Sequence, residues 1–225
     1  MLNNFEEFTS NPLMNMHHVF RYSGVMLSEP ESLATHIVEV QVMGYMLIDK
    51  LNNSFGEDIS YGVFLEKALH HDLEESLTGD VCRTLKYHNP RVLKELQDVA
   101  AETATNIYSK YFEDPIRVTK LWDEAKKGKE GVIVKIVDML CVANKALREV
   151  SLLNNNYFLK VVYEVSRYLT DVKVFVENNS PYNADSTQYL VSLIEDAITK
   201  MKTLWDERKD IADKYKILDT TLLEG

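Results

Sequence analysis

Apolar residues recur at intervals of three and four positions through most of this 225-residue chain. The stretch around 33–51 shows this clearly, with apolar side chains at Leu33, Ile37, Val40, Met43, Leu47 and Leu51. Such spacing places them on one face of an α-helix, whereas the strict alternation typical of a half-buried strand is scarce. The pattern therefore predicts an all-α protein. We expect helices at 30–52, 59–76, 90–112, 115–127, 129–154, 157–178 and 183–207.

The breaks between these expected helices coincide with turn-forming sequences. "NNSFGED" and "TGD" carry loop residues, and "NNSPYNADS" has the composition of a linker. "YHNP" and "FEDP" each end in a proline, which suits the first turn of a helix. The length suits one sizeable core, so we expect a single helical-bundle domain over 1–225, with a last helix and tail in 183–225.

Composition narrows the class of protein. With 45% hydrophobic and 27% charged residues the chain is typical of a compact globular protein. A formal charge of -10 argues against nucleic-acid polymers and anionic membranes as partners. The N-terminus does not resemble a secretory signal, and two cysteines are too few for a disulfide framework. No apolar run approaches the roughly 18 residues of a membrane span, so we expect a cytoplasmic protein.

Candidate chemistry is concentrated in "HHDLEESLTGD", residues 70–80. His71 and Asp72 are adjacent and point about 100° apart on a helix, so both can reach one ion only near a helix end or in a groove. His70 is expected to be a neighbour and not a ligand. Two polar residues on otherwise apolar faces, His36 and Asp138, are candidates for further ligands. Burying an aspartate without a cation or hydrogen-bond donors destabilises a fold by on the order of several kcal/mol, because the carboxylate loses its hydration.

This ordered set resembles the HD-domain phosphohydrolase superfamily. "HDLEESLTGD" is similar to the HD-x-x-E-x-x-TGD segment of bacterial 5'-deoxynucleotidases, and "VKIVDMLCVANKALREV" resembles their late metal-binding helix. "KYHNP" is also similar to that subfamily, and the likeness is strongest over 16–175. Two departures lie upstream, because Tyr22 stands where tryptophan is usual and Thr35 stands where glutamate is usual.

The resemblance implies one divalent cation held by His36, His71, Asp72 and Asp138. Two imidazoles and two carboxylates leave positions open on an octahedral metal for water and a phosphate oxygen. Such a set suits Mn, Co, Mg or Fe better than structural zinc, which prefers closed tetrahedral sites.

The resemblance also implies roles for residues around the cation. Glu75 follows Asp72 by three residues, so its carboxylate can overhang the site and orient or deprotonate the attacking water. Arg21 is the expected clamp for the phosphate, and Tyr22 the expected packing surface for sugar or base. Asp80, closing "TGD", is carried over from the subfamily as the residue that disfavours a 2'-hydroxyl and selects deoxyribose.

We therefore expect a metal-dependent enzyme that releases phosphate from 2'-deoxynucleoside 5'-monophosphates, and by resemblance a homodimer or higher homo-oligomer. One alternative is a deoxynucleoside triphosphate triphosphohydrolase, similar to short phage enzymes that destroy dATP. It would need further cations for the other phosphates, for which the candidates are Arg83, Lys86, Arg117 and Lys120. Another alternative is a non-catalytic module that binds a nucleotide or a protein, although a degenerate family member would most readily have lost one of the ligands or Glu75.

Overall fold

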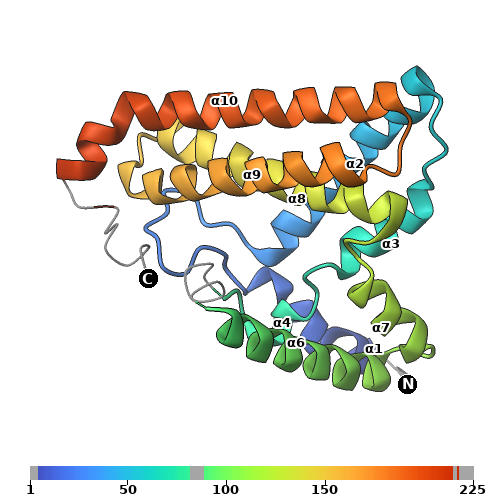
Figure 1. Cartoon of the computed structure of the whole chain (residues 1–225). Coiled ribbons are helices and arrows are strands. Elements are labelled where there is room, and N and C mark those ends of the chain that lie inside the picture. Colours follow the sequence, from blue (N-terminus) through green and yellow to red (C-terminus); the bar gives the residue numbers. More distant parts are fainter. Residues whose placement is uncertain (1–4, 82–88, 215–216, 218–225) are drawn as a thin grey trace. The chain divides into compact units, whose positions relative to one another are not determined.

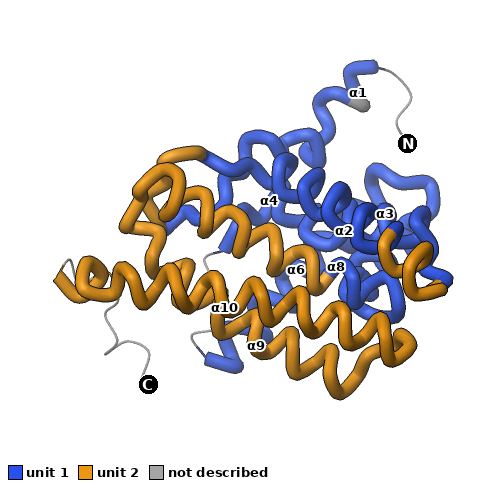
Figure 2. The backbone as a smooth tube through the Cα atoms, turned by 90° about the horizontal axis from the view of Figure 1, so that it is seen from above, with its two compact units in different colours: residues 1–24, 30–49, 58–134 blue, residues 25–29, 50–57, 135–225 orange. Residues whose placement is uncertain are grey.

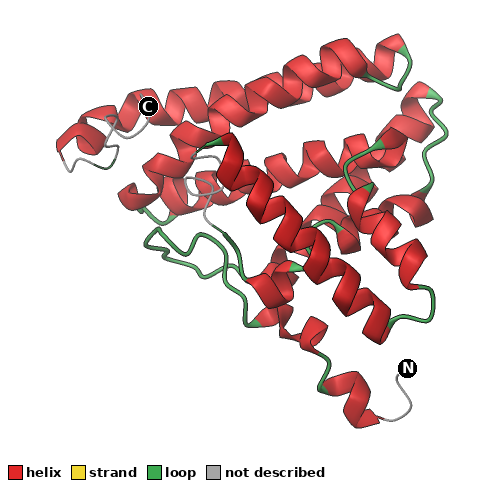
Figure 3. Ribbon diagram, turned by 60° about the horizontal axis from the view of Figure 1, so that its bottom comes forward, coloured by secondary structure: helices red, strands yellow, loops and turns green. Residues whose placement is uncertain are grey.

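The computed structural model describes residues 5–81, 89–214 and 217. Within these ranges the chain consists of helices joined by loops, without a β-strand (Figure 3). The expectation of an all-α protein is confirmed. In the same ranges, none of the helices combines the length and apolarity that a bilayer span requires.

The chain divides into two compact units (Figure 2). Unit 1 comprises 1–24, 30–49 and 58–134, and unit 2 comprises 25–29, 50–57 and 135–225. Two helices, α2 and α8, continue from one unit into the other. That the whole chain forms one domain stays a prediction.

The helices from α2 onward follow the sequence pattern except near the "HHD" cluster and in α10, which extends to Lys214 where the expected helix ends at 207. α1 and η1 lie outside the expected helices (Figure 1). In chain order the helices are α1 (Phe5–Thr9), the 3-10 helix η1 (Pro12–His17), α2 (Leu33–Phe55), α3 (Tyr61–His70), α4 (Glu75–Thr78), α6 (Pro90–Tyr111), α7 (Pro115–Asp123), α8 (Gly128–Leu147), the π-helix η2 (Arg148–Leu152), the 3-10 helix η3 (Asn156–Phe158), α9 (Leu159–Asn179) and α10 (Ala184–Lys214).

Side-chain caps explain why several helices begin where they do. The Asn89 side chain accepts a hydrogen bond from the Val92 N–H at the start of α6, and Pro90 occupies the first turn. The Asp114 side chain caps α7 in the same way, ahead of Pro115. These caps satisfy backbone donors that lack a partner inside the helix. The helix starts expected after "YHNP" and "FEDP" are confirmed, although residues 82–88 lie outside the described part of the chain.

The helix expected at 59–76 is wrong in its second half. α3 ends at His70, a turn follows, and α4 begins at Glu75. In the turn, backbone N–H groups donate three residues back, from Glu75 to Asp72 and from Ser76 to Leu73. Consecutive residues here are buried, so no single helical face could bury them all. The apolar periodicity gives no sign of this break, because the apolar residues on either side keep a spacing compatible with one continuous helix.

A hydrophobic core in unit 1 anchors this turn. Leu73, next to Asp72, packs in a cluster with residues of η1, α6 and α7, namely Leu13, Ala104, Ile107, Tyr108 and Val118. Further along, α2 and α3 approach closely at Gly44, where an added Cβ would lie 2.0 Å from the Phe64 Cζ atom. These two contacts fix the α2 segment that carries His36 and the turn that carries His71 within one unit.

Unit 2 is built mainly on α9 and α10, which lie side by side (Figure 1). Their apolar faces are buried, with Leu169 and Val176 on α9 and Leu190 and Ile194 on α10 among the fully buried side chains. Both faces follow the three- and four-residue spacing of the sequence, which is why this pair was predictable.

A buried carboxylate, Glu149, organises the other end of unit 2. It is fully buried and accepts hydrogen bonds from the backbone N–H groups of Ser28 (2.9 Å) and Glu29 (3.0 Å). It also accepts from Asn155 Nδ2 (2.7 Å) and lies 2.9 Å from Lys145 Nζ. Burial alone would raise the pKa of Glu149, but these donors outweigh it and lower the pKa to about 2. Glu149 therefore stays ionised and holds the 25–29 segment.

We expect Glu149→Ala to lower the free energy of unfolding by about 3–5 kcal/mol at pH 7, because it leaves buried Lys145 without its carboxylate. The folded-state pKa of Glu149 lies below the usual 4.5, so its contribution is complete above pH 4.5 and is lost as the pH falls toward 2. Urea unfolding of both proteins should show their difference narrowing across that window. A difference that stays constant with pH, or equals that of exposed Glu102→Ala, would contradict this account.

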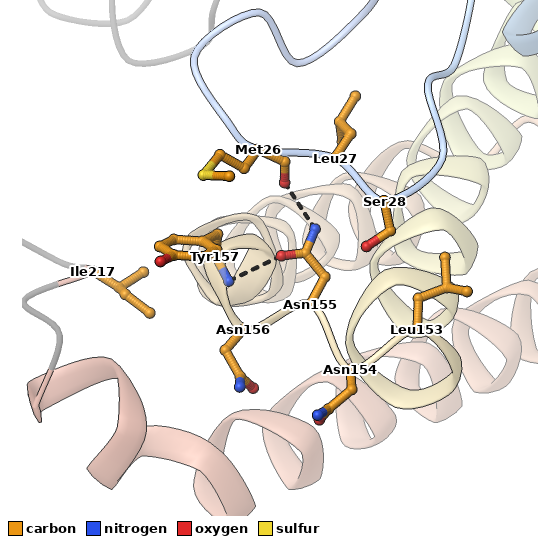
Figure 4. A pocket seen from close by; sticks show the side chains of 9 residues that line it. All are labelled: Met26, Leu27, Ser28, Leu153, Asn154, Asn155, Asn156, Tyr157 and Ile217. Carbon is orange, nitrogen blue, oxygen red and sulfur yellow. Dashed lines mark hydrogen bonds between the residues drawn. The ribbon is translucent and has the colours of Figure 1, made fainter.

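A cavity of about 440 Å³ lies beside this carboxylate in unit 2 (Figure 4). Residues 26–28 line one side and 153–157 the other. Asn155 joins the two sides, since its Nδ2 donates to the Met26 carbonyl and its Oδ1 accepts from the Tyr157 N–H. The same side chain thus connects Glu149 to both walls.

Candidate metal centre

A short antiparallel bridge positions the first half of the site. Phe20 pairs with Ser32, the Arg21 N–H donates to the Glu31 carbonyl (2.9 Å), and the Leu33 N–H donates to the Val19 carbonyl (2.8 Å). α2 starts directly afterwards at Leu33, so His36 lies in its first turn. The bridge therefore fixes Arg21 and Glu31 close to the helix start that carries the imidazole.

Three of the expected ligands come together in unit 1. His71 Nε2 lies 3.4 Å from His36 Nε2 and 3.3 Å from Asp72 Oδ2, and His36 Nε2 lies 3.8 Å from Asp72 Oδ2. Metal–ligand bonds of about 2.1 Å place neighbouring ligand atoms roughly 3.0–3.4 Å apart. The three donor atoms are therefore spaced for one cation after small adjustments. Because α3 ends at His70, His71 and Asp72 lie in the turn that follows, where both side chains can face one point.

The orientation of His71 suits metal binding. Its Nδ1 lies 2.6 Å from the Ala68 carbonyl oxygen, which can only accept a hydrogen bond. The proton is therefore on Nδ1, and the lone pair of Nε2 points toward His36 and Asp72. Metal-binding histidines characteristically have their second nitrogen fixed in this way.

Glu31 is a component that the sequence analysis missed. It is 5% exposed, and its Oε1 lies 3.3 Å from Arg21 Nε and 3.8 Å from His36 Nδ1. At 3.8 Å the Glu31 carboxylate is too far from His36 Nδ1 for a hydrogen bond, so it lies beside the imidazole while it pairs with Arg21. A faint signal existed, because Glu31 lies five residues before His36 in a segment otherwise interpreted as a helix start.

The fourth expected ligand, Asp138, lies on α8. It is 9% exposed, one helical turn after Val134, the last residue of unit 1. Its neighbours Val137, Met139 and Cys141 are buried, as the sequence indicated. Its part in the metal site stays a proposal.

His70, by contrast, does not share in the cluster. Its ring packs edge-on against Tyr108 (5.6 Å between centroids) and Phe112 (5.9 Å). Burial lowers its pKa to about 4, so the ring is neutral near pH 7. The position agrees with a packing role.

The residues expected around the substrate also lie next to the cluster. Arg21 Nη1 is 3.3 Å from Asp72 Oδ2, and its guanidinium carbon lies 5.6 Å from the centre of the Tyr22 ring. Asp80 Oδ2 accepts a hydrogen bond from the Tyr22 N–H (2.9 Å). Glu75 is 8% exposed, and its own N–H donates to the Asp72 carbonyl (3.1 Å). Their functional roles stay predictions.

A cavity of about 600 Å³ in unit 1 opens onto two of the ligands, His71 and Asp72. Its other lining residues lie in α4 or next to it, in α6, and at the end of α7 or just after it, and include Glu74, Thr78, Val81, Leu96, Asp98, Val99, Trp122, Asp123 and Lys126. The volume lies in the range of small-molecule sites. No sequence signal linked Trp122 or α6 to the site, because both lie far along the chain from the "HHD" cluster.

Comparison with known proteins decides the family. The family model described as "5'-deoxynucleotidase YfbR-like" matches residues 8–181. The chain belongs to the YfbR-like family. It is therefore a hydrolase with the HD-domain fold, which confirms the resemblance seen in "HDLEESLTGD" and the α8 sequence.

Curated relatives of this YfbR-like protein agree with the assignment. The 5'-deoxynucleotidase of Vibrio vulnificus is 29% identical over 132 residues, which is 57% of this chain and 68% of the relative. The 5'-deoxynucleotidase YfbR of Escherichia coli is 27% identical over 132 residues, which is 57% of this chain and 66% of the relative.

Solved structures share the fold of this YfbR-like protein. An HD-domain phosphohydrolase from Listeria innocua superposes with a TM-score of 0.65 at 20% identity, covering 87% of this chain and 97% of its own. The HD phosphohydrolase DatZ of cyanophage S-2L, bound to dA and one catalytic Zn²⁺ ion, gives 0.56 at 18% identity, covering 84% and 95%. At these identities the two structures show the fold alone.

Proposed function

We propose that this YfbR-like protein removes phosphate from 2'-deoxynucleoside 5'-monophosphates by attack of a water molecule on the phosphorus. The observation that carries the proposal is the convergence of His36, His71 and Asp72 beside the Arg21 guanidinium, with two of these ligands facing a cavity. The names of the curated relatives support deoxynucleotides as the substrate class.

His36, His71, Asp72 and Asp138 hold one divalent cation in this proposal. Asp138, 9% exposed among apolar residues of α8, supports the fourth ligand, because a buried carboxylate is favourable beside a cation. The mixed nitrogen and oxygen set suits Mn, Co, Mg or Fe, and leaves positions for water and phosphate. When bound, such a cation polarises the phosphoryl group and lowers the pKa of a coordinated water.

The protein's own residues supply positioning and proton transfer. Glu75, buried in the first turn of α4, orients or deprotonates the attacking water. Arg21 binds the phosphate, since its guanidinium already lies at Asp72 and can present several N–H groups to phosphate oxygens. Tyr22 packs on the sugar or base. Asp80 faces the sugar and disfavours a 2'-hydroxyl.

Charge in the cavity favours a monophosphate over a triphosphate. Besides the expected ligand Asp72, the described lining residues contribute three carboxylates, from Glu74, Asp98 and Asp123, and one lysine, Lys126. Additional phosphates beyond the metal would meet mainly like charge. Of the four cations considered for a triphosphate, Arg117 pairs with Glu66. Lys120 is exposed on α7, and Arg83 and Lys86 lie outside the described residues.

Product analysis tests the proposal. The purified protein is dialysed against chelator, loaded in turn with Mn, Co, Mg or Fe, and offered deoxynucleoside mono- and triphosphates and the matching ribonucleoside monophosphates. We expect free deoxynucleoside and inorganic phosphate from the monophosphates. Release of triphosphate would identify a triphosphohydrolase instead. Nucleotide binding without turnover under every metal would indicate a non-catalytic module.

We also propose, from the family resemblance, that the protein acts as a homodimer or higher homo-oligomer and, from its sequence composition, that it acts in the cytoplasm. Light scattering during gel filtration measures the first property, and fractionation of the source cells measures the second. A strictly monomeric active protein would contradict the first.

A further inference from the structure

Tyr22 has an unusual backbone conformation next to the proposed phosphate site. Its φ is +62°, and among the described non-glycine residues it shares a positive φ with Asn154. Asparagine adopts this region readily, whereas a bulky aromatic residue does so only when its surroundings enforce it. Strained backbone of this kind gathers at functional sites. A specific contact must therefore hold Tyr22 in place.

Asp80 supplies that contact. Its Oδ2 accepts the Tyr22 N–H at 2.9 Å, across 58 residues of sequence. Asp80 is itself placed by Gly79, which ends α4 with a φ of +74° that L-residues rarely adopt. On the preceding residue, the Arg21 N–H donates to the Glu31 carbonyl at 2.9 Å. Both backbone N–H groups of the Arg21–Tyr22 pair are thus fixed, one of them by a carboxylate side chain.

This arrangement determines where the Arg21 guanidinium lies. Its Nε is 3.3 Å from Glu31 Oε1 and its Nη1 is 3.3 Å from Asp72 Oδ2. If Tyr22 lost the Asp80 contact and relaxed to an ordinary φ, the peptide plane that joins it to Arg21 would reorient, and we expect the guanidinium to be held less firmly at Glu31 and Asp72. The hydrogen bond to Asp80 therefore affects, through the main chain, the position of Arg21 on the phosphate side of the site.

We propose that Asp80 is a positioning residue: by holding Tyr22 in its strained conformation, it fixes Arg21 for phosphate binding, whatever group the phosphate carries. This inference rests on the proposed function and adds to the expected role of Asp80 near the sugar. A residue that only contacts the sugar would affect the preference for deoxyribonucleotides over ribonucleotides. A residue that positions Arg21 affects substrates that contain no sugar at all.

The test compares Asp80→Ala with Asp80→Asn in the metal-loaded protein. Asparagine keeps an oxygen that can accept the Tyr22 N–H, whereas alanine removes it. The probes are p-nitrophenyl phosphate, which lacks a sugar, one deoxynucleoside monophosphate, and inorganic phosphate measured by calorimetry. We expect Asp80→Ala to raise KM for both substrates and Kd for phosphate on the order of tenfold, the factor for losing one hydrogen bond to a charged acceptor. Asp80→Asn should recover most of this loss.

Controls separate positioning from damage. Metal content and thermal unfolding midpoint should be unchanged in Asp80→Ala, and Asp58→Ala, an exposed aspartate of the same unit, should behave as wild type. Wild-type phosphate affinity and p-nitrophenyl phosphate kinetics in Asp80→Ala, with a gain only in ribonucleotide turnover, would overturn the inference. If wild type binds phosphate but hydrolyses no substrate, the proposed function fails, and the calorimetric comparison still decides the positioning role.

Discussion

Asp72→Ala will remove both the bound metal and the turnover of this protein. Asp72 Oδ2 lies within 3.8 Å of both histidine Nε2 atoms and 3.3 Å from Arg21 Nη1, so the substitution deletes the oxygen on which the cluster converges. A catalytic metal supplies several kcal/mol of charge stabilisation, so activity should fall by at least about 10³-fold. Metal analysis after dialysis and product release from the deoxynucleoside monophosphate measure the two effects.

A thermal shift separates metal loss from unfolding. Added Mn should raise the unfolding midpoint of wild type, because ligand that binds only the folded state stabilises it, and should leave Asp72→Ala unchanged. The matched control is Asp171→Ala, which removes an exposed aspartate on α9 and should retain metal and rate. Full activity in Asp72→Ala would show that the His36, His71 and Asp72 cluster is not the catalytic metal site.

Glu75→Gln will keep the metal and lose the rate. The substitution preserves shape and hydrogen bonding but removes the base, and general-base catalysis contributes about 10²–10⁴-fold. We expect kcat to fall within that range while metal content and KM stay near those of wild type.

Glu74→Gln is the informative comparison for this prediction. Glu74 is the adjacent carboxylate, equally buried, and it lines the cavity together with His71 and Asp72. Sequence position assigns the water-activating role to Glu75. A larger loss of kcat in Glu74→Gln than in Glu75→Gln would transfer that role to Glu74 without affecting the metal site.

Periodicity and capping made most of the helices predictable. α6 and α7 begin at prolines preceded by Asn89 and Asp114, whose side chains cap the helices. α9 and α10 keep their apolar residues at helical spacing over their length. These signals are local, so one sequence contains all the information that they need.

The site was predictable only in its ligand types. His36 and Asp72 were selected by chemistry and family order, yet the turn that lets His71 and Asp72 face one point interrupts a helix expected to be continuous. Glu31 and the α6 wall of the cavity were missed, because their relevance depends on contacts between distant segments. Glu149 was missed for the same reason: a glutamate within a helical sequence gives no sign that four donors surround it.

The pairing of Glu149 with the 25–29 segment has a consequence during synthesis. Ser28 leaves the ribosome 121 residues ahead of the carboxylate that will hold it. At about 5–20 residues per second, the nascent segment stays without its anchor for on the order of ten seconds. The 25–29 segment of unit 2 therefore reaches its anchored position only after translation of η2, which carries Glu149.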